Sequence, residues 1–535
     1  MSDIQRLLQQ RYYHLGESKW EHVARRVAAF LCPDKDIVYG MLKQAIVNKE
    51  LLPSSPTLMN TGTARPMLAS CFVLPVEDSI ESIMKSLTDT VLIQKYGGGV
   101  GLNFSAIRAE GSLIKTTGGK ASGPVSFMGF WNEAMNVIRQ GGRRQGAMMG
   151  VLNVDHPDLE FFLNAKTLEG QLTNFNLSVG LDAEFFLRLN AKKGGYPSLK
   201  PYLSGMDAEQ ILYYIAQHAW ENGEPGVLFL DNINKDNPYD IPIEATNPCG
   251  EVPLPPYGVC CLGSINLNAV LIEDTRGWVI DWNKLEGLVR LGIQMLDRIL
   301  TYSWWPIPEV AAFQELNRPL GLGVMGLADI LVKLNRPYGS EQGRRFVDYL
   351  FECIRDVADD EADIIAKEVR SKVVLSIAPT GSIAMLADAS YSIEPYFALN
   401  FTKNVEAGSF HTQVSTLVAV LNKQQISFVE KDIEIIERTG SVQETSHLPS
   451  SIKSLFRMAN ELSPKEHLYM QQAVQQHVDS AVSKTINLPT DTTIEDIEGI
   501  IILAHDLGLK GLTVYRNRSR EVEAITCPLG GTCDD

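Results

Sequence analysis

Short apolar runs that alternate with helical segments are the feature of this sequence that most constrains its fold. Examples are VLFLDNIN, SINLNAVLI, GLGVMGLADILVKL and SKTINLP, spread between residues 227 and 489. Such alternation predicts an α/β fold. Earlier in the chain, helical periodicity marks much of the first fifty residues. We expect a strand at 70–76 and an amphipathic helix at 80–95, with Asp78 and Glu81 placed as in a capping box.

No clear boundary divides the chain after residue 51. We therefore expect one large catalytic domain at 51–515, preceded by a helical region at 1–50. The last segment, 516–535, is polar, rich in turn residues and contains two cysteines. Its composition is typical of a flexible tail.

Composition and charge exclude several classes of protein. The net charge of −16 argues against a nucleic-acid binder, which needs a basic face. No apolar run approaches the roughly 18 residues of a membrane span, and the first residues lack a signal core. We expect a cytoplasmic protein, in which eight cysteines do not form a disulfide framework.

Three of these cysteines lie within ATNPCGEVPLPPYGVCCLGSINL, residues 245–267. In NPCGE, Asn247, Cys249 and Glu251 bring an amide, a thiol and a carboxylate together on a turn-forming Pro and Gly framework. That combination suits a redox or nucleophilic centre with an acid/base group, although a buried cysteine in an ordinary turn is the alternative. No metal site is expected, because paired C-x-x-C spacing and a nearby histidine are missing.

Two glycine-containing turns are candidates for ligand contact. The segment IAPTGSIAML at 377–386 predicts a strand, a turn and a helix start, where free N–H groups can bind phosphate or simply form a helix cap. The segment GGGVG at 97–101 allows the backbone to approach a ligand closely, or forms a plain turn.

Ten motifs occur in one order over about 460 residues: PSSPTLMNTGT, ASCFVLPVEDS, GGGVGLNFSAIR, GGRRQGAMMGVLNVDHPD, NPCGE, GSINL, RPLGLGVMGLAD, APTGSIA, SKTINLP and KGLTVYR. Together they resemble the catalytic chain of the ribonucleotide reductases, specifically the adenosylcobalamin-dependent class II enzymes. The resemblance implies a ten-stranded α/β barrel with a central finger loop and a small N-terminal helical region. It implies reduction of ribonucleotides, with diphosphates favoured, to 2′-deoxyribonucleotides.

The resemblance also assigns roles at the finger-loop tip. Cys249 would carry the thiyl radical that removes the 3′-hydrogen of the substrate. Glu251 would take the proton of the 3′-hydroxyl, and Asn247 would hydrogen-bond the ribose hydroxyls.

Electrons would come from a second set of cysteines. The family pattern matches Cys71 and Cys260 as the dithiol, with the adjacent Cys261 as the alternative to Cys260. Cys527 and Cys533 in the tail would carry electrons to this pair from a thioredoxin- or glutaredoxin-type reductant, although their spacing is wider than the family's C-x-x-C.

The same resemblance implies two nucleotide sites. The substrate would contact Ser55, Ser70, Gly99, Pro379, Thr380, Gly381, Ser382 and Ile383. A deoxynucleoside triphosphate effector would bind near a helix that pairs subunits in a homodimer, at Asp78, Arg108, Lys115 and Arg144. A helix cap is the alternative role of Asp78, and a solvated basic turn is the alternative for the loop that contains Arg144.

The last strand motif bears on how the radical is made. Class I chains have two consecutive tyrosines there, whereas this chain has Thr513-Val514-Tyr515. The resemblance therefore favours adenosylcobalamin as the cofactor. The alternatives are a class I-type large subunit that uses a separate radical-generating protein, and an inactive nucleotide sensor with the same fold.

Overall fold

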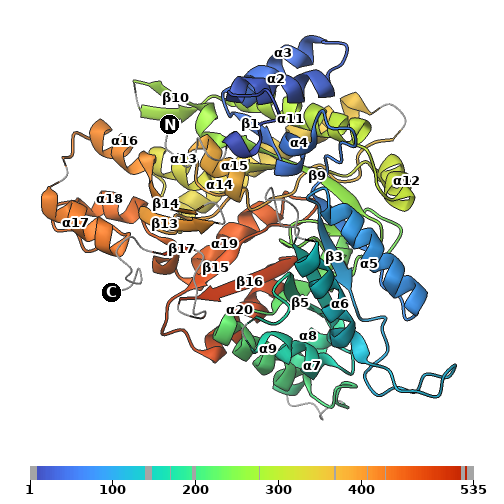
Figure 1. Cartoon of the computed structure of the whole chain (residues 1–535). Coiled ribbons are helices and arrows are strands. Elements are labelled where there is room, and N and C mark those ends of the chain that lie inside the picture. Colours follow the sequence, from blue (N-terminus) through green and yellow to red (C-terminus); the bar gives the residue numbers. More distant parts are fainter. Residues whose placement is uncertain are drawn as a thin grey trace.

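Two groups of parallel strands form the centre of the molecule (Figure 1). The computed structural model describes residues 9–138, 147–168, 170–194, 200–275, 277–366, 369–405, 408–427, 429–517, 519 and 525–526. The first group is β2 (Cys71–Leu74), β3 (Gly99–Asn103), β4 (Met148–Asn153), β5 (Phe175–Leu181) and β6 (Gly226–Phe229). The second contains β9 (Val259–Asn266), β12 (Leu320–Met325), β15 (Thr485–Leu488) and β16 (Gly511–Arg516). Antiparallel pairing of β2 with β9 and of β6 with β16 joins the groups.

Residues 373–377 close the ring between β12 and β15. Leu375 bridges Leu322 of β12, and Ile377 bridges Val482, which lies just before β15; both bridges are parallel. Backbone hydrogen bonds follow the same path, from Leu322 N to Val374 O (3.0 Å) and from Ile377 N to Ala481 O (3.1 Å). Counted with this segment, the ring contains ten strands among the described residues. The predicted ten-stranded α/β barrel is confirmed.

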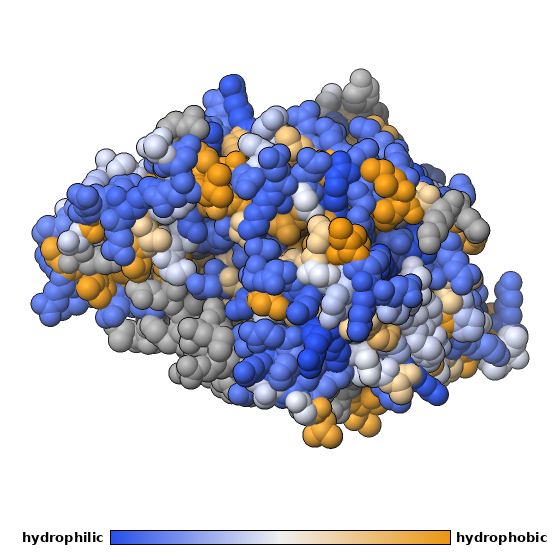
Figure 2. Space-filling model, turned by 90° about the horizontal axis from the view of Figure 1, so that it is seen from above, coloured by the Kyte–Doolittle hydropathy of each residue, from blue (hydrophilic) through white to orange (hydrophobic). Residues whose placement is uncertain are grey.

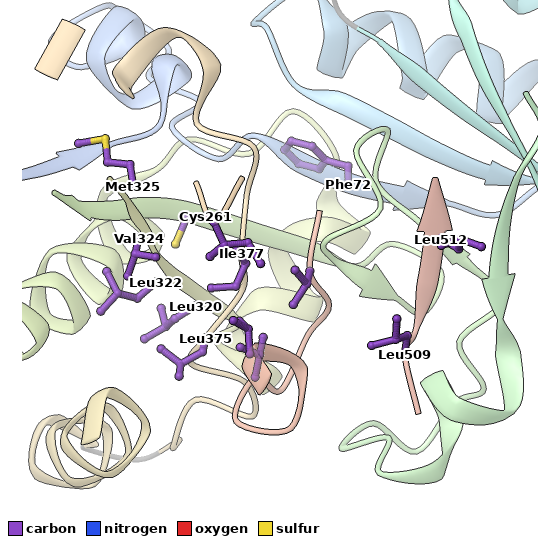
Figure 3. Packing of buried hydrophobic residues seen from close by; sticks show 14 of the residues in the cluster. Phe72, Cys261, Leu320, Leu322, Val324, Met325, Leu375, Ile377, Leu509 and Leu512 are labelled. Atoms are coloured by element: carbon purple, nitrogen blue, oxygen red, sulfur yellow. The ribbon is translucent and has the colours of Figure 1, made fainter. Parts of the chain in front are cut away.

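Side chains alternate between the two faces of the barrel wall. An inner cluster around the barrel interior includes Cys71, Val73, Met149, Val151, Cys260 and Leu262. The residues between them, such as Phe72, Leu74, Met148 and Cys261, belong to the larger core between the strands and the surrounding helices. Figure 3 shows part of this outer packing, with Cys261 among apolar side chains that include Leu322 and Val324. The period-2 geometry of strands therefore separates a reactive interior from a structural exterior.

Helices surround the barrel (Figure 1). The longer ones are α2 (Trp20–Leu31), α3 (Ile37–Val47), α5 (Ile80–Gln94), α6 (Gly123–Val137), α8 (Ala183–Lys193), α9 (Ala208–Asn222), α11 (Trp282–Tyr302), α12 (Pro308–Asn317), α14 (Glu341–Ile365), α19 (Pro464–Gln475) and α20 (Ile494–Asp506). Shorter ones are α4 (Ser55–Asn60), α7 (Leu159–Leu163), α10 (Leu230–Lys235), α13 (Leu327–Lys333) and α15 (Gly381–Ala387).

An outlying part contains α16 (Ser415–Lys423), α17 (Glu430–Thr439), α18 (Ser450–Leu455) and the strands β13 (Asn400–Val405), β14 (Gly408–Gln413) and β17 (Ile525–Thr526). A separate buried cluster that includes Leu417, Ile452 and Phe456 lies among these helices. Three further strands are β1 (Leu51–Pro53), which pairs with β9, and the hairpin of β10 (Leu271–Asp274) and β11 (Gly277–Ile280).

Several local predictions can be compared with these elements. The predicted strand at 70–76 and helix at 80–95 correspond to β2 and α5, and α2 and α3 confirm the N-terminal helical region. The predicted capping box, with Asp78 as the N-cap residue of this helix, is wrong. Ser79 caps α5 by accepting a hydrogen bond from Ser82 N (3.1 Å), while Asp78 pairs with Arg108 Nε (2.7 Å).

The N-terminal helices share the main core. Buried residues of α2 and α3 belong to the same cluster as the barrel exterior, and Trp20 Nε1 donates a hydrogen bond to Ile46 O (2.8 Å). Tyr12 also contacts the start of α4, where its hydroxyl lies 2.9 Å from Ser55 Oγ. The division into 1–50, 51–515 and 516–535 stays a prediction.

A finger loop runs inside the barrel. It consists of β7 (Ala245–Thr246) and β8 (Pro253–Leu254), an antiparallel pair joined by a tip at 247–252. Glycines on β3 leave room for it: a Cβ at Gly101 would lie 1.8 Å from Thr246 O, and one at Gly99 would lie 2.9 Å from Pro248 Cγ. Asn103, also on β3, donates from Nδ2 to Glu244 O (2.8 Å).

The outer surface is mixed in character. Figure 2 shows one face on which apolar residues form small, separate groups among hydrophilic ones. None of the helices in the described ranges combines the length and the apolar character that crossing a membrane requires.

We predict that Gly101→Ala destabilises the chain by about 1–3 kcal/mol or more, because the new methyl group must displace the backbone of the finger loop. Unfolding in urea measures the change. Gly499→Ala is the matched control: it lies in α20 with open space around the Cβ position, and should stabilise the chain by about 1 kcal/mol. Equal stability of Gly101→Ala and the unaltered chain would contradict the packing described here.

Candidate active site

A tight turn forms the tip of the finger loop. Gly250 N donates to Asn247 O (3.1 Å), and Gly250 has a φ of +83°, in the left-handed region that glycine tolerates. The Asn247 side chain closes the turn by accepting a hydrogen bond from Val252 N at Oδ1 (3.0 Å). This geometry leaves Cys249 exposed while Glu251 is buried, with 1% of its surface accessible.

Hydrogen bonds from both halves of the barrel fix the tip. Asn176 on β5 donates to Pro248 O (2.9 Å). On the opposite side, Glu251 O accepts hydrogen bonds from Ser376 Oγ (2.9 Å) and Ala481 N (2.8 Å). The residues on either side of Cys249 are therefore held by two separate parts of the ring.

Two buried cysteines lie beside the tip on neighbouring strands. Cys71 of β2 and Cys260 of β9 are direct partners in the antiparallel register, which brings their Cβ atoms to about 5 Å. Asn247 Nδ2 donates to Cys71 Sγ (3.2 Å), so the pair also touches the finger loop. Burial, followed by the nearby Cys261, Cys71 and Glu251, raises the pKa of the Cys260 thiol well above its usual range. Cys260 is therefore a protonated thiol at neutral pH.

Cys261 faces away from this pair. Its Sγ lies 3.4 Å from Leu296 O on α11, in the outer core. Because neighbouring strand residues point to opposite faces, only one of the two adjacent cysteines can meet Cys71. The structure places Cys260 there.

A first cavity of about 330 Å³ opens on one side of the tip. Asn247, Cys249 and Glu251 line it together with Cys71, whereas Cys260, the strand partner of Cys71, is not among the lining residues. All eight residues predicted to contact substrate also line it: Ser55, Ser70, Gly99, Pro379, Thr380, Gly381, Ser382 and Ile383. The structure thus brings together residues separated by more than 300 positions in the sequence.

The turn at Pro379–Ile383 presents its backbone to this cavity. Thr380 has a φ of +56° and precedes α15, and its Oγ1 accepts a hydrogen bond from Ser392 N (2.8 Å). A Cβ at Gly381 would meet nothing within 4 Å, so there is open space beside the backbone of the turn at this residue.

A second cavity of about 530 Å³ lies on the other side of the same tip. Pro248, Cys249 and Gly250 form part of its wall, and the rest comes mainly from β5, β6, β15 and β16. Many lining residues are small, among them Ser178, Gly223, Gly226, Ser483, Gly511 and Thr513. This cavity can accept a large group and bring one of its atoms to the Cys249 thiol.

Buried charge borders the second cavity at one point. The Lys484 side chain is fully buried and donates to Glu394 Oε2 (2.5 Å), which compensates its charge. Burial nevertheless lowers the pKa of Lys484. Among the described residues, no cluster of His, Cys, Asp and Glu side chains is suited to hold a metal ion.

Three of the predicted effector residues, Asp78, Arg108 and Lys115, lie outside both cavities. Asp78 and Arg108 form an ion pair, and Lys115 is exposed in the turn at 113–120. Arg144, Cys527 and Cys533 lie outside the described residues.

Sequence reasoning missed Arg11, which lines the first cavity. Among the described residues around that cavity it is the one with a cationic side chain. No motif surrounds it. The hydrogen bond between Tyr12 and Ser55 brings this part of the chain to the site, and such a long-range contact has no local signal.

Comparisons with known proteins agree with this geometry. Residues 69–370 and 360–515 match the family described as "Ribonucleotide reductase, barrel domain". A vitamin B12-dependent ribonucleoside-diphosphate reductase of Mycobacterium tuberculosis is 40% identical, over 90% of this chain and 72% of that protein. One from Thermoplasma acidophilum is 38% identical, over 90% of this chain and 66% of that protein. Among solved structures, the Actinobacillus ureae class Id ribonucleotide reductase alpha subunit shares the fold, with a TM-score of 0.82, 24% identity and 97% coverage of each chain.

We predict that mild oxidation of the folded chain joins Cys71 to Cys260, because their side chains face each other across paired strands. Proteolysis followed by mass spectrometry of the cross-linked peptides identifies the bond. Cys261→Ser should leave the cross-link unchanged, whereas Cys260→Ser should abolish it. A Cys71–Cys261 bond in the folded chain would contradict the strand register.

Proposed function

This chain belongs to the ribonucleotide reductase family, and we propose that it reduces ribonucleoside diphosphates to 2′-deoxyribonucleotides with adenosylcobalamin as its cofactor. The observation that carries this proposal is the position of Cys249. Cys249 lines both cavities, so its thiol can react with a radical source in one cavity and with a ribose in the other.

The finger-loop tip supplies the groups that act on the ribose. An S–H bond is weak enough to give up its hydrogen atom, and the resulting sulfur radical at Cys249 can take the 3′-hydrogen. Glu251 lines the same cavity and would accept the proton of the 3′-hydroxyl as general base. Asn247 gives one amide hydrogen to Cys71, and the second can be donated to a ribose hydroxyl.

The buried dithiol would supply the electrons. Replacing the 2′-hydroxyl by hydrogen releases water and consumes two electrons and two protons. Cys71 and Cys260 provide the two electrons and the two protons when their thiols are oxidised to one disulfide. Their register as direct cross-strand partners supports this role, because the bond can form without moving either strand far.

The first cavity would bind the nucleotide by its phosphates. The open backbone of Pro379–Ile383 offers N–H donors, and Ser55 and Ser70 add hydroxyl groups. Arg11 would add positive charge near the phosphates. The names of the relatives, which specify ribonucleoside diphosphates, support a diphosphate substrate.

The second cavity would hold the cofactor. When bound, adenosylcobalamin supplies a carbon-centred radical by homolysis of its cobalt–carbon bond. The small side chains on β15 and β16 leave room for a large ligand, and the finger-loop tip forms the wall nearest the substrate. The last barrel strand reads Thr513-Val514-Tyr515, so it lacks the consecutive tyrosines of a class I radical relay.

Further partners complete the proposal. A thioredoxin- or glutaredoxin-type protein would restore the dithiol through Cys527 and Cys533. A deoxynucleoside triphosphate would bind at Asp78, Arg108, Lys115 and Arg144, next to helices that pair subunits in a homodimer. Each cycle leaves a disulfide that must be reduced, which suits the cytoplasm.

We predict that Cys249→Ala abolishes measurable turnover and leaves the dissociation constant of a ribonucleoside diphosphate within about threefold, because the methyl group keeps the loop geometry but has no transferable hydrogen. Activity assays and equilibrium dialysis measure the two quantities. Cys261→Ala is the matched cysteine control and should retain most turnover, since Cys261 faces the outer core. Substantial turnover by Cys249→Ala would show that the radical site is misassigned.

We predict that the purified chain converts CDP to dCDP with adenosylcobalamin and a small dithiol, without a second protein. Omitting the cofactor should stop the reaction. Turnover that needs a separate radical-generating protein would instead favour the class I-type alternative. Nucleotide binding with no turnover under either condition would favour a nucleotide sensor.

A further inference from the structure

A third cavity, of about 520 Å³, lies at the end of the barrel opposite the substrate cavity. Its lining includes Lys372, Asp479 and Lys510, which precede three parallel segments of the second half of the ring. The substrate turn at 379–383 instead comes after one of those segments, 373–377, and so lies at the opposite end of it. None of the catalytic steps described above uses this cavity.

Positive charge exceeds negative charge around the cavity. Lys235, Arg355, Lys372 and Lys510 line it, together with the carboxylates Asp236 and Asp479.

Asp479 is already engaged by neighbouring groups. Its Oδ2 accepts hydrogen bonds from Val374 N (2.9 Å) and Leu375 N (3.1 Å), and its Oδ1 forms an ion pair with Arg355. Within the described part of the chain, Lys235 and Lys372 have no ion-pair partner. The charge of these two lysines is therefore available to a ligand.

Lys510 adds a partly desolvated ammonium group. Its Nζ donates to Asp479 O (2.5 Å), and burial lowers the pKa of Lys510 although Asp479 and Asp236 act in the opposite direction. An anion in the cavity would replace part of the lost hydration of this ammonium group.

Gln475 provides a second kind of contact. It lines the cavity, is 7% exposed, and donates from Nε2 to Val478 O and Ser480 O, both at 3.2 Å. Its Oε1 accepts no hydrogen bond from the described residues. A buried acceptor of this kind suits a hydroxyl donor on a ligand.

We propose that this cavity binds a small phosphate-bearing molecule, with Lys235, Lys372 and Lys510 supplying the charge for the phosphate and Gln475 accepting a hydroxyl group. Lysines commonly bind phosphate as point charges. Ala481, whose N–H donates to Glu251 O, comes only two positions after Asp479. The proposed site therefore lies close to the hydrogen bond that holds the finger loop at Glu251.

Calorimetric titration with pyrophosphate tests the proposal. Because pyrophosphate can also occupy the phosphate turn of the first cavity, the unaltered chain should show two saturable sites, at one of which the double variant Lys235→Ala/Lys372→Ala binds pyrophosphate about tenfold more weakly or worse. Lys465→Ala is the matched control, because it removes an exposed lysine from α19, the helix that carries Gln475, and should leave binding unchanged. Equal binding by the double variant and the control would overturn the proposal.

Two further measurements complete the test. Ribose 5-phosphate should bind more tightly than inorganic phosphate if Gln475 accepts a hydroxyl, and Gln475→Leu should remove that difference. If the double variant does not fold, crystals of the unaltered chain soaked in pyrophosphate decide the question. Density between Lys235, Lys372 and Lys510 would support the site, and its absence at saturating concentration would refute it.

Discussion

The carbonyl oxygen of Thr246 occupies the space where a side chain at residue 101 would begin, 1.8 Å from the Cβ position of Gly101. The finger loop can lie inside the barrel because β3 has no side chain at this point. Hydrogen bonds from Asn176 on one side and from Ser376 and Ala481 on the other then fix the tip. Preorganisation of this kind matters for catalysis, since an error of about 1 Å in placement can cost 100-fold in rate.

The four cysteines of the barrel have the same thiol group but different surroundings. Cys249 is exposed on a turn between two cavities, where a thiol can exchange hydrogen with ligands on either side. Cys71 and Cys260 are buried partners on adjacent strands, and this burial would protect the proposed dithiol from other oxidants. Cys261 is one residue further along β9 and faces the outer core. A difference of one residue along β9 thus separates the proposed redox cysteine, Cys260, from Cys261, which packs in the outer core.

Local patterns in the sequence predicted local features well. The alternation of apolar runs and helices indicated the α/β class, and the Pro and Gly of NPCGE indicated the exposed tip. The motif resemblance predicted the barrel, and the eight residues that it suggested for substrate contact all line the first cavity. The motif resemblance favoured Cys260 over Cys261, but the physical reason is the pairing of β9 with β2, almost 190 residues apart, which has no local signal. Asp78 was misassigned as a cap because Arg108, distant in sequence, competes for its carboxylate. Arg11 reaches the site through tertiary packing, which no short pattern reveals.

A crystal structure of the chain with a bound ribonucleoside diphosphate tests the central claim most directly. If one thiol at the finger-loop tip begins the chemistry, the ribose C3′ must lie within about 4 Å of Cys249 Sγ, with the phosphates on the backbone of Pro379–Ile383. A nucleotide seated in that cavity with its C3′ well beyond 6 Å from the sulfur, roughly twice the reach of hydrogen-atom transfer, would contradict the account.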